Sequence, residues 1–308
     1  MDFAEYMGMS PVNKFQYFMK TRLTTNRTPS YWVKWENANK HIASYEVSLN
    51  TLNYLVGKEN IAEEARKLFL EQPNLIKTIP LLIASRDMTL DVLIVDADNE
   101  MSHSLIDFLN PDISKIDLYL NFMKDSGLLN FLEKELNESL VDYVLGVQVG
   151  LDSNGRKNRS GQQNERILAT LLERVVSGDE SLHYLLQPTQ VQMFNQWGIL
   201  VPEVTPSKNK GGRRYDGAIY NDLTETVTII ETNFYGSGGS KLKAVAGEFS
   251  DLYSVNFKNA KNVNFVWISD GPGWDTAKNP MEEAFAIIPN IINVTMAKNG
   301  YLSELVEK

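Results

Sequence analysis

GGRRYDGAIYNDLTETVTIIETNFYGSGGSKLK spans residues 211–243 and holds the clearest secondary-structure pattern in the chain. Within it, RRYDGAIY and the β-branched run VTIIETN each have the composition of a β-strand. The Asn221–Asp222 pair between them predicts a turn, so the two strands are expected to form a hairpin. The glycine-rich FYGSGGS leads to SKLKAVAGEFSDLY, whose apolar spacing predicts a helix packed on the sheet.

Two carboxylates are expected to meet at one end of this hairpin. Alternate residues of a strand share a face, so Glu231 and Asn233 lie on the same side of the second strand, at its polar end. Asp216 lies on the first strand and is brought to the same end by the hairpin. Like charges at close range repel, and their burial is unfavourable unless a cation is present. A hard divalent ion with oxygen ligands, Mg²⁺ or Mn²⁺, is the expected partner.

The spacing from Asp216 to the Glu-x-Asn sequence at Glu231 resembles that of the PD-(D/E)xK nuclease core. The chain departs from this pattern at two positions. Tyr215 stands in place of the proline, and Asn233 stands in place of the lysine. Taken alone the spacing is weakly specific, because many strands end in acidic residues that are simply solvated.

The composition is that of a globular protein. The chain has 308 residues, of which 43 % are apolar and 22 % charged, so it can form one large or two ordinary domains. No run of about 18 apolar residues is present, so no membrane-spanning segment is expected. The first residues have no basic n-region and no apolar h-region, so no signal peptide is expected. The absence of cysteine excludes disulfides and thiolate metal sites and suits the cytoplasm.

Two further kinds of site are not expected. The histidines (His41, His103 and His183) show no metal-ligand spacing, so a zinc site is not predicted. No phosphate-binding glycine sequence of the P-loop or Rossmann type follows a strand, so no nucleotide cofactor is predicted.

The two halves of the sequence have different patterns. Residues 1–150 are expected to form a mainly helical N-terminal region. Its apolar spacing predicts helices within 48–85 and over 103–109, 112–125, 127–136 and 138–147. Residues 151–308 are expected to form the catalytic core. They contain several strands, including VNFVWIS at 263–269, separated by helical segments, which indicates an α/β core with a central sheet flanked by helices.

The charge distribution leaves two interpretations open. The net charge of −9 argues against a simple basic nucleic-acid-binding surface. The positive charges nevertheless gather in three clusters around the carboxylate stretch, which indicate either a basic cleft or ordinary loop charges. These clusters are Arg156, Lys157 and Arg159; Lys208, Lys210, Arg213 and Arg214; and Lys241 and Lys243.

A third carboxylate is predicted to face inward. The segment Leu151–Gly161 is polar and is expected to be a loop, with Ser160 capping the helix that follows. Glu165 precedes Leu168 by three residues and is therefore expected on the apolar stripe of that helix. A buried carboxylate needs a partner. Either Glu165 pairs with Arg159 or a backbone amide near the helix start, or it points toward the metal and orders its water.

Three blocks of sequence resemble the MboI/DpnII-type restriction endonucleases. They are GRKNRSG (155–161), IIETNFYGSGGSKL (229–242) and VWISDGPGW…AKN (266–279), in order and in register. LVDYVLGVQVGLDSN (140–154) and PLLIASR (80–86) are similar too, and the resemblance covers roughly residues 45–290. Together the blocks are far more specific than the carboxylate spacing.

The resemblance implies a type II restriction endonuclease with the PD-(D/E)xK fold, from a bacterial restriction–modification system. The family cuts both strands of the palindrome 5′-GATC-3′ before the G, requires Mg²⁺, and is blocked by adenine methylation of the site. A palindromic target on double-stranded DNA implies a homodimer.

The resemblance also assigns catalytic residues. Asp216 and Glu231 are expected to hold the metal, and Asn233 falls where other PD-(D/E)xK nucleases have the catalytic lysine. An asparagine donates and accepts hydrogen bonds but carries no charge. The lysine of GSKL falls on Lys241, which is expected to supply the positive charge instead.

The chain departs from the family pattern at details that concern DNA contacts. Gly217 follows Asp216 where the family has phenylalanine, Lys243 stands where the family often has asparagine and then glutamate, and SKNKGG (207–212) lies outside the resemblance. Ser240 opens a helix whose N-terminus favours an anion. The residues predicted to bind DNA are Arg156, Lys157, Asn158, Arg159, Arg213, Arg214, Ser240 and Lys243.

Three functions of different classes are weighed. A Mg²⁺-dependent endonuclease is favoured by the family resemblance. A DNA-binding protein that has lost catalysis is suggested by the missing lysine and the acidic net charge. A glycoside hydrolase would use Asp216 and Glu231 as its carboxylate pair and would need no metal. The glycine-rich turn before a helix and the basic clusters fit phosphate better than sugar.

Overall fold

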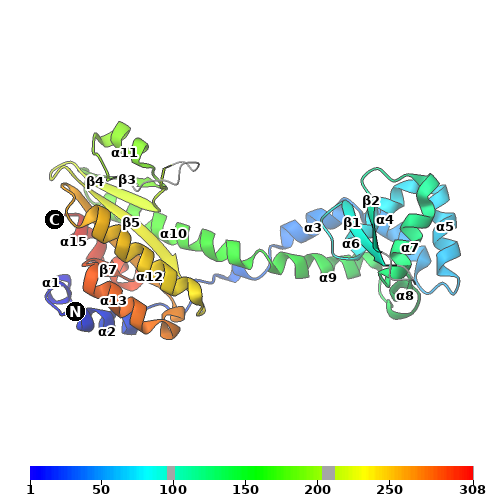
Figure 1. The fold of residues 1–308 in the computed structure, drawn as a ribbon, viewed down its shortest axis with the longest axis horizontal. Helices are drawn as coiled ribbons and strands as arrows, with labels where there is room; N and C mark the ends of the chain where they lie inside the picture. The colour runs from blue at the N-terminus through cyan, green and yellow to red at the C-terminus, as the bar shows by residue number, and fades with distance from the viewer. Residues whose placement is uncertain (96–100, 203–211, 308) are drawn as a thin grey trace. The chain divides into compact units, whose positions relative to one another are not determined.

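The computed structural model describes residues 1–95, 101–202 and 212–307 (Figure 1). They form two compact units: unit 1 comprises Met1–Thr28 and Lys157–Lys308, and unit 2 comprises Pro29–Arg156. Each unit has its own core of buried apolar side chains. Within the described ranges, no helix is both long and apolar enough to cross a membrane.

Unit 2 is mainly helical, as the sequence predicts. Each longer helix presents an apolar stripe to the core; α5, for example, buries Ile61, Ala65 and Leu68 on one face. The α-helices are α3 (Trp35–Ala43), α4 (Glu46–Leu52), α5 (Ile61–Glu71), α6 (Ile79–Leu82), α7 (Ile116–Asp125), α8 (Leu128–Asn130) and α9 (Leu140–Ser153). Short 3₁₀ and π turns are η1 (Pro29–Tyr31), η2 (Asn53–Leu55), η3 (Pro73–Thr78), η4 (Ile113–Lys115) and η5 (Phe131–Glu135).

The helix predicted over 103–109 is wrong, because this segment belongs to a β-hairpin. β1 (Thr89–Val95) pairs antiparallel with β2 (Met101–Asp107). In β2, Leu105 is exposed and Ile106 is buried, which is the alternation of a strand that covers the core with one face. A short apolar run does not distinguish a strand from a helix by its sequence alone.

Unit 1 is built on a five-stranded mixed sheet with the strand order β3-β4-β5-β6-β7. β3 (Leu182–Leu186), β4 (Gly217–Asn221) and β5 (Thr226–Phe234) are antiparallel neighbours. β5, β6 (Val263–Asp270) and β7 (Ile291–Ile292) run parallel. The predicted hairpin at 221–222 and the predicted strand at 263–269 are therefore confirmed, and so is the α/β class.

Helices cover both faces of this sheet. Leu168 and Leu172 of α10 lie over Gly217, where an added Cβ would come within 2.9 Å of the Leu172 side chain. Phe249 of α12 contacts Trp267. Trp267 pairs with Glu231, the residue after the Ile230 that pairs with Gly217, so its side chain lies on the opposite face of the sheet. The helices of unit 1 are α1 (Phe3–Met7), α2 (Pro11–Thr21), α10 (Arg156–Val176), α11 (Gln190–Trp197), α12 (Ser240–Leu252), α13 (Lys278–Ile287), α14 (Val294–Met296) and α15 (Leu302–Val306), with turns η6 (Tyr253–Phe257), η7 (Pro272–Thr276) and η8 (Ala297–Tyr301).

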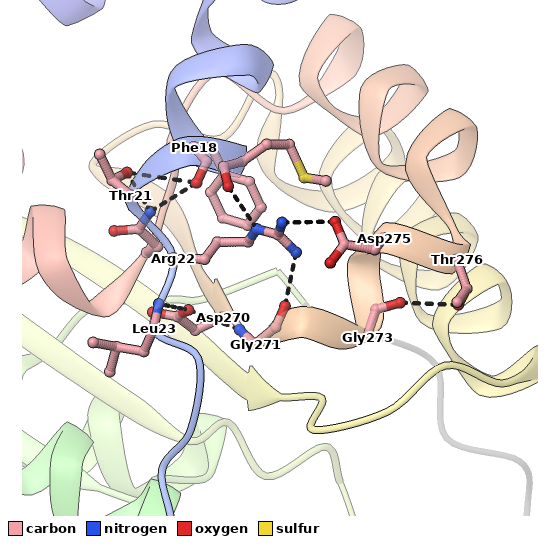
Figure 2. Close-up of polar contacts among 11 residues, drawn as sticks. Phe18, Thr21, Arg22, Leu23, Asp270, Gly271, Gly273, Asp275 and Thr276 are labelled. Atoms are coloured by element: carbon pink, nitrogen blue, oxygen red, sulfur yellow. Dashed lines mark hydrogen bonds and ion pairs between the residues drawn. The ribbon is translucent and has the colours of Figure 1, made fainter.

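The first 28 residues pack with the sheet and not with the helical unit. Phe18 contacts Phe285 of α13 at 5.4 Å between ring centroids, and the Tyr6 hydroxyl donates to the Ile291 carbonyl at 2.6 Å. Figure 2 shows the end of this segment, where Leu23 binds Asp270, the last residue of β6, and Arg22 binds Gly271 in the loop that follows. The expected division into 1–150 and 151–308 thus differs from the two compact units. The N-terminal segment belongs to unit 1, and the second boundary lies between residues 156 and 157.

The loop predicted over 151–161 is wrong. α9 continues to Ser153 and α10 begins at Arg156, so the connection between them is short. Ser160 lies inside α10 instead of capping it, and its hydroxyl bonds Asn26 Oδ1 at 3.2 Å. The first turns of α10 are polar and carry no apolar period, so the sequence pattern there is that of a loop.

Candidate active site

Asp216 and Glu231 lie opposite each other at one end of the β4–β5 pair. Gly217 pairs with Ile230, so the next position outward in this antiparallel register sets Asp216 against Glu231. The backbone N–H of Thr232 donates to Asp216 Oδ2 at 2.8 Å. Glu231 is buried, with 5 % of its surface exposed. The predicted meeting of two carboxylates is confirmed.

The electrostatics of this pair are unfavourable without a cation. Burial, followed by the charge of Asp216, raises the pKa of Glu231 to about 8, although Arg213 opposes this shift. Burial also raises the pKa of Asp216, and the hydrogen bond from Thr232 opposes it. A buried and a half-buried carboxyl group that each favour the proton are a suitable site for a divalent cation.

Arg213 supplies the positive charge next to this pair. Its Nε and Nη2 donate to Glu231 Oε1 at 3.0 and 2.8 Å, and its Nη1 donates to Glu248 Oε1 at 3.0 Å. The sequence predicts that Arg213 contacts DNA. The guanidinium instead partners the two glutamates, and it stabilises the ionised form of Glu231.

A cavity of about 790 Å³ opens beside Asp216, between α10, the end of β5 and the start of α12. Glu231 is not among its lining residues, and its carboxylate is bound by Arg213. The predicted site residues that line the cavity are Lys157, Asn158, Glu165, Asp216, Asn233 and Lys241. Residues separated by up to 84 positions along the chain (241 − 157 = 84) thus share one cavity.

Asn233 is held from behind by two buried side chains. Its Oδ1 accepts a hydrogen bond from the Ser269 hydroxyl at 2.5 Å. The Ser269 oxygen in turn accepts from Trp274 Nε1 at 2.9 Å.

The buried position predicted for Glu165 is wrong. α10 starts earlier than the sequence pattern indicates, and Asn164, four residues before Leu168, is the polar residue on the buried stripe. Glu165 is exposed, so it does not require the partner that burial would impose. Its side chain nevertheless lines the cavity, close in space to Asp216.

The other residues predicted to bind DNA lie around this region in different settings. Arg156 and Arg159 are in the first turn of α10, and Arg156 Nε donates to the Trp32 carbonyl at 3.2 Å. Arg214 is exposed on the segment before β4. Ser240, the first residue of α12 as predicted, and Lys243 are exposed. Lys208 and Lys210 lie outside the described residues.

The chemistry of the donor set fits a divalent ion. Asp216 and Glu231 offer hard carboxylate oxygens. The residues described contain no cluster of three or more His, Cys, Asp or Glu side chains able to hold a metal. The chain would therefore contribute these two carboxylates, and backbone carbonyls, water and DNA phosphate are the oxygen ligands that could complete the coordination.

Comparison with known proteins identifies the family. The DpnII restriction endonuclease family matches residues 14–304. This chain belongs to the DpnII restriction endonuclease family. It is 46 % identical over 308 residues to the type II restriction enzyme LlaDCHI of Lactococcus lactis subsp. cremoris, covering 100 % of this chain and 99 % of that protein.

Two further DpnII-family relatives also align over nearly their whole length. The type II restriction enzyme MjaIII of Methanocaldococcus jannaschii is 38 % identical, covering 95 % of this chain and 99 % of that protein. The type II restriction enzyme DpnII of Streptococcus pneumoniae is 33 % identical, covering 96 % of this chain and 100 % of that protein. The resemblance seen in the sequence blocks is confirmed. The protein is a type II site-specific deoxyribonuclease, and DNA is its partner.

The sequence did not indicate several residues that shape this site. Arg213 is seen only as one member of a basic cluster, and nothing in its neighbourhood points to Glu231. Asn164 and Thr232 are joined by a 3.3 Å hydrogen bond, and the buried Asn164 Oδ1 has no partner within the described ranges. Ser269 and Trp274 do lie in the family block VWISDGPGW, which was the signal that could have found them.

Proposed function

We propose that the protein is a Mg²⁺-dependent endonuclease of a bacterial restriction–modification system. It cuts both strands of unmethylated DNA at 5′-GATC-3′, before the G, and acts as a homodimer. The sheet of unit 1 is its PD-(D/E)xK core, with Asn233 in the place of the usual lysine. Mn²⁺ can substitute for Mg²⁺.

The observation that carries this proposal is the pair formed by Asp216 and Glu231 beside the cavity. The two carboxylates are opposed across the β4–β5 pair, and the pKa of Glu231 is raised to about 8 by burial and by Asp216. Asn233 and Lys241 line the same cavity. Asp216, Asn233 and Lys241 around the cavity, with Glu231 opposite Asp216, are the groups needed to hold a metal and hydrolyse a phosphodiester.

Each residue has a separate role in the proposed reaction. Asp216 and Glu231 would hold Mg²⁺, which when bound would supply a Lewis acid for the scissile phosphate and lower the pKa of water. Asn233 donates hydrogen bonds to the phosphate, and Lys241 stabilises the negative charge that develops on it. Glu165 orders water in the cavity. Arg213 favours the ionised form of Glu231 and so opposes the effect of burial.

The surroundings of the cavity suit a DNA backbone. Lys157 and Asn158 line it from the first turn of α10, and Arg156 and Arg159 belong to the same turn. Basic residues at a helix start are repelled by the positive end of the helix dipole. A phosphate bound there would interact favourably with both the dipole and the basic side chains. The further phosphate contacts proposed are Arg214, Ser240 and Lys243. Arg213 contacts DNA only if it leaves Glu231.

The role of unit 2 follows from the same proposal. A two-fold palindrome requires two active sites related by symmetry, one for each strand. Unit 2 contacts DNA, contributes to the dimer, or braces the core. Analytical ultracentrifugation of the full chain, alone and with a GATC duplex, tests for the dimer.

One gel tests the activity and its specificity. Purified protein is incubated with unmethylated and with adenine-methylated plasmid, in Mg²⁺ and in EDTA, and the ends are mapped. The expected result is a discrete ladder with GATC ends, seen only in Mg²⁺ and only on unmethylated DNA. Different discrete ends would retain the nuclease and reject the GATC specificity. Intact DNA in every lane, together with a gel shift, would support the alternative of a catalytically impaired DNA-binding protein.

A further inference from the structure

A chain of buried hydrogen bonds lies behind Asn233. Ser269, at the end of β6, and Trp274, in η7, both have no exposed surface. Trp274 Nε1 donates to Ser269 Oγ at 2.9 Å, and Ser269 Oγ donates to Asn233 Oδ1 at 2.5 Å. Asn233 lines the cavity beside Asp216, so the chain runs from the protein interior to the candidate site.

The direction of this chain follows from the chemistry of the indole. An indole nitrogen is only a donor, so the Ser269 oxygen must accept from Trp274. The one hydroxyl hydrogen of Ser269 is then left for Asn233 Oδ1. If the Asn233 amide were turned round, two donors would point at Ser269, and its own hydrogen would be buried without an acceptor. A buried hydroxyl without an acceptor costs about 1–3 kcal/mol. The hydrogen bonds of Ser269 and Trp274 therefore determine the orientation of the Asn233 amide, independently of how its oxygen and nitrogen atoms are assigned.

The consequence is that Asn233 presents its NH₂ group to the cavity. Among the described residues, none accepts a hydrogen bond from Asn233 Nδ2. We propose that Ser269 and Trp274 are positioning residues that hold the Asn233 carboxamide with its oxygen inward and its NH₂ outward, as a donor to the scissile phosphate. This inference rests on the proposed function of the cavity. It explains how an uncharged asparagine replaces a lysine, because a fixed donor needs no reorganisation during the reaction.

The loop that carries Trp274 is itself held in place. Gly271 has φ of +100°, and a Cβ there would lie 2.4 Å from the Tyr235 carbonyl oxygen. Gly273 N–H donates to the same carbonyl at 2.8 Å. Figure 2 shows Arg22 Nη1 donating to the Gly271 carbonyl at 2.9 Å, from the N-terminal segment. The sequence block DGPGW therefore builds a rigid support for the indole.

The first test uses the Trp274 indole N–H signal in nuclear magnetic resonance spectra of the full chain, without DNA or metal. The chain has five tryptophans, and Trp274→Phe assigns the signal. Asn233→Ala is expected to shift it, because the Ser269 hydroxyl loses its acceptor and the bonds of such a chain are coupled. Asn233→Asp keeps an acceptor for Ser269 and is expected to retain the hydrogen-bonded signal. A Trp274 signal that does not respond to Asn233→Ala would overturn the chain.

The second test measures the single-turnover cleavage rate, with DNA affinity determined separately in EDTA. Trp274→Phe is expected to lower the rate by roughly 10²-fold, the lower range for losing one oriented donor, with affinity unchanged. Trp267→Phe is the matched control. Its Nε1 has no hydrogen-bond partner among the residues that the structure describes, and its ring contacts Trp274 at 5.7 Å between centroids. This control removes the same volume from the same cluster and is expected to cleave near the wild-type rate.

A double-mutant cycle separates positioning from general destabilisation. In the Asn233→Ala background, Trp274→Phe is expected to cause no further loss of rate. Equal losses for Trp274→Phe and Trp267→Phe, or additive losses in the cycle, would overturn the positioning role while leaving the nuclease intact. Asn233→Asp is expected to lose cleavage while it keeps the indole signal, because it turns the cavity-facing donor into an acceptor.

Failure of the proposed function gives a different result. If wild-type protein does not cleave in Mg²⁺ while the Trp274 signal still responds to Asn233→Ala, the hydrogen-bond chain is present and its catalytic purpose is rejected. If wild-type protein cleaves and the signal does not respond, the nuclease stands and the inference fails.

Discussion

Two acidic sites lie toward the same end of the parallel strands β5 and β6: the pair Asp216 and Glu231, and the single residue Asp270. Asp270 has no exposed surface, and its carboxylate accepts backbone N–H bonds from Leu23, Gly271 and Val294 at 2.6, 2.7 and 3.0 Å. Glu231 is bound by the Arg213 side chain and lies against a second acid, Asp216. Burial raises the pKa of each, but at Asp270 the three N–H bonds and the charge of Arg22 oppose it.

The difference separates a structural acid from a site for a ligand. Asp270 has its charge satisfied by fixed dipoles, and it joins three chain segments that are distant in sequence. The pair of Asp216 and Glu231 is left with mutual repulsion, which a divalent cation relieves. Asp270 is therefore expected to matter for folding, and the pair is expected to matter for cleavage.

The largest expected effect is the loss of cleavage rate caused by Glu231→Gln. Removing one of two metal-binding charges is expected to lower the single-turnover rate about a thousandfold, equivalent to about 4 kcal/mol of transition-state stabilisation. Unfolding of the metal-free protein in urea at neutral pH is expected to show little loss of stability, because a Glu231 with a pKa of about 8 is already mostly uncharged there. Glu248→Gln is the matched control, since Glu248 binds the same Arg213 and its side chain is 54 % exposed. A Glu231→Gln enzyme with near-normal rate would reject the metal-binding role.

The next largest effect is the loss of stability caused by Asp270→Asn. An amide has one acceptor oxygen and brings two new donors toward three backbone N–H groups, so the free energy of unfolding is expected to fall by roughly 3 kcal/mol. Urea denaturation measures this, with the exposed Asp251→Asn as control. The rate of the folded fraction is expected to stay close to that of the wild type. Lost cleavage with unchanged stability would mean that Asp270 belongs to the active site.

A smaller effect is expected from Lys241→Ala. Lys241 lines the cavity, whereas Lys243, two residues further along the same helix, does not. Lys241→Ala is expected to slow single-turnover cleavage roughly 10- to 100-fold, because a charge that stabilises the transition state is lost. Lys243→Ala is expected to weaken DNA binding modestly and to leave the rate at saturating DNA unchanged. Near-normal turnover in Lys241→Ala would remove it from the catalytic residues.

The smallest effect, counted per pH unit, is the pH dependence of stability in the metal-free protein. The pKa of Glu231 is raised from 4.5 to about 8 in the folded state, so between these values the folded state binds more protons than the unfolded state. The stability from this group is present below about pH 4.5 and is lost as the pH rises toward 8. The slope contributed is at most about 1.4 kcal/mol per pH unit. Urea denaturation across this range should show the slope in wild-type protein and its loss in Glu231→Gln; equal slopes would contradict it.

Local patterns predicted the elements whose packing is simple. The β4–β5 hairpin, the β6 strand and the start of α12 at Ser240 follow from β-branched composition, turn residues and apolar spacing. The pattern failed where these signals are weak. The polar first turns of α10 are helical without an apolar period, and β2 is too short to be distinguished from a helix. Glu165, three residues before Leu168, is predicted on the buried stripe, but the position four residues before Leu168, Asn164, occupies it.

The sequence by itself determined the family, the α/β class and the opposition of Asp216 and Glu231. Those features depend on spacing within one hairpin and on blocks of adjacent residues, which are local properties of the chain. Only the tertiary structure decided that Arg213 binds Glu231, that Asp270 joins the N-terminal segment to the end of β6, and that Trp274 and Ser269 support Asn233. These contacts are hydrogen bonds between side chains or segments far apart in sequence. Their donors and acceptors are matched only after the strands and helices have packed.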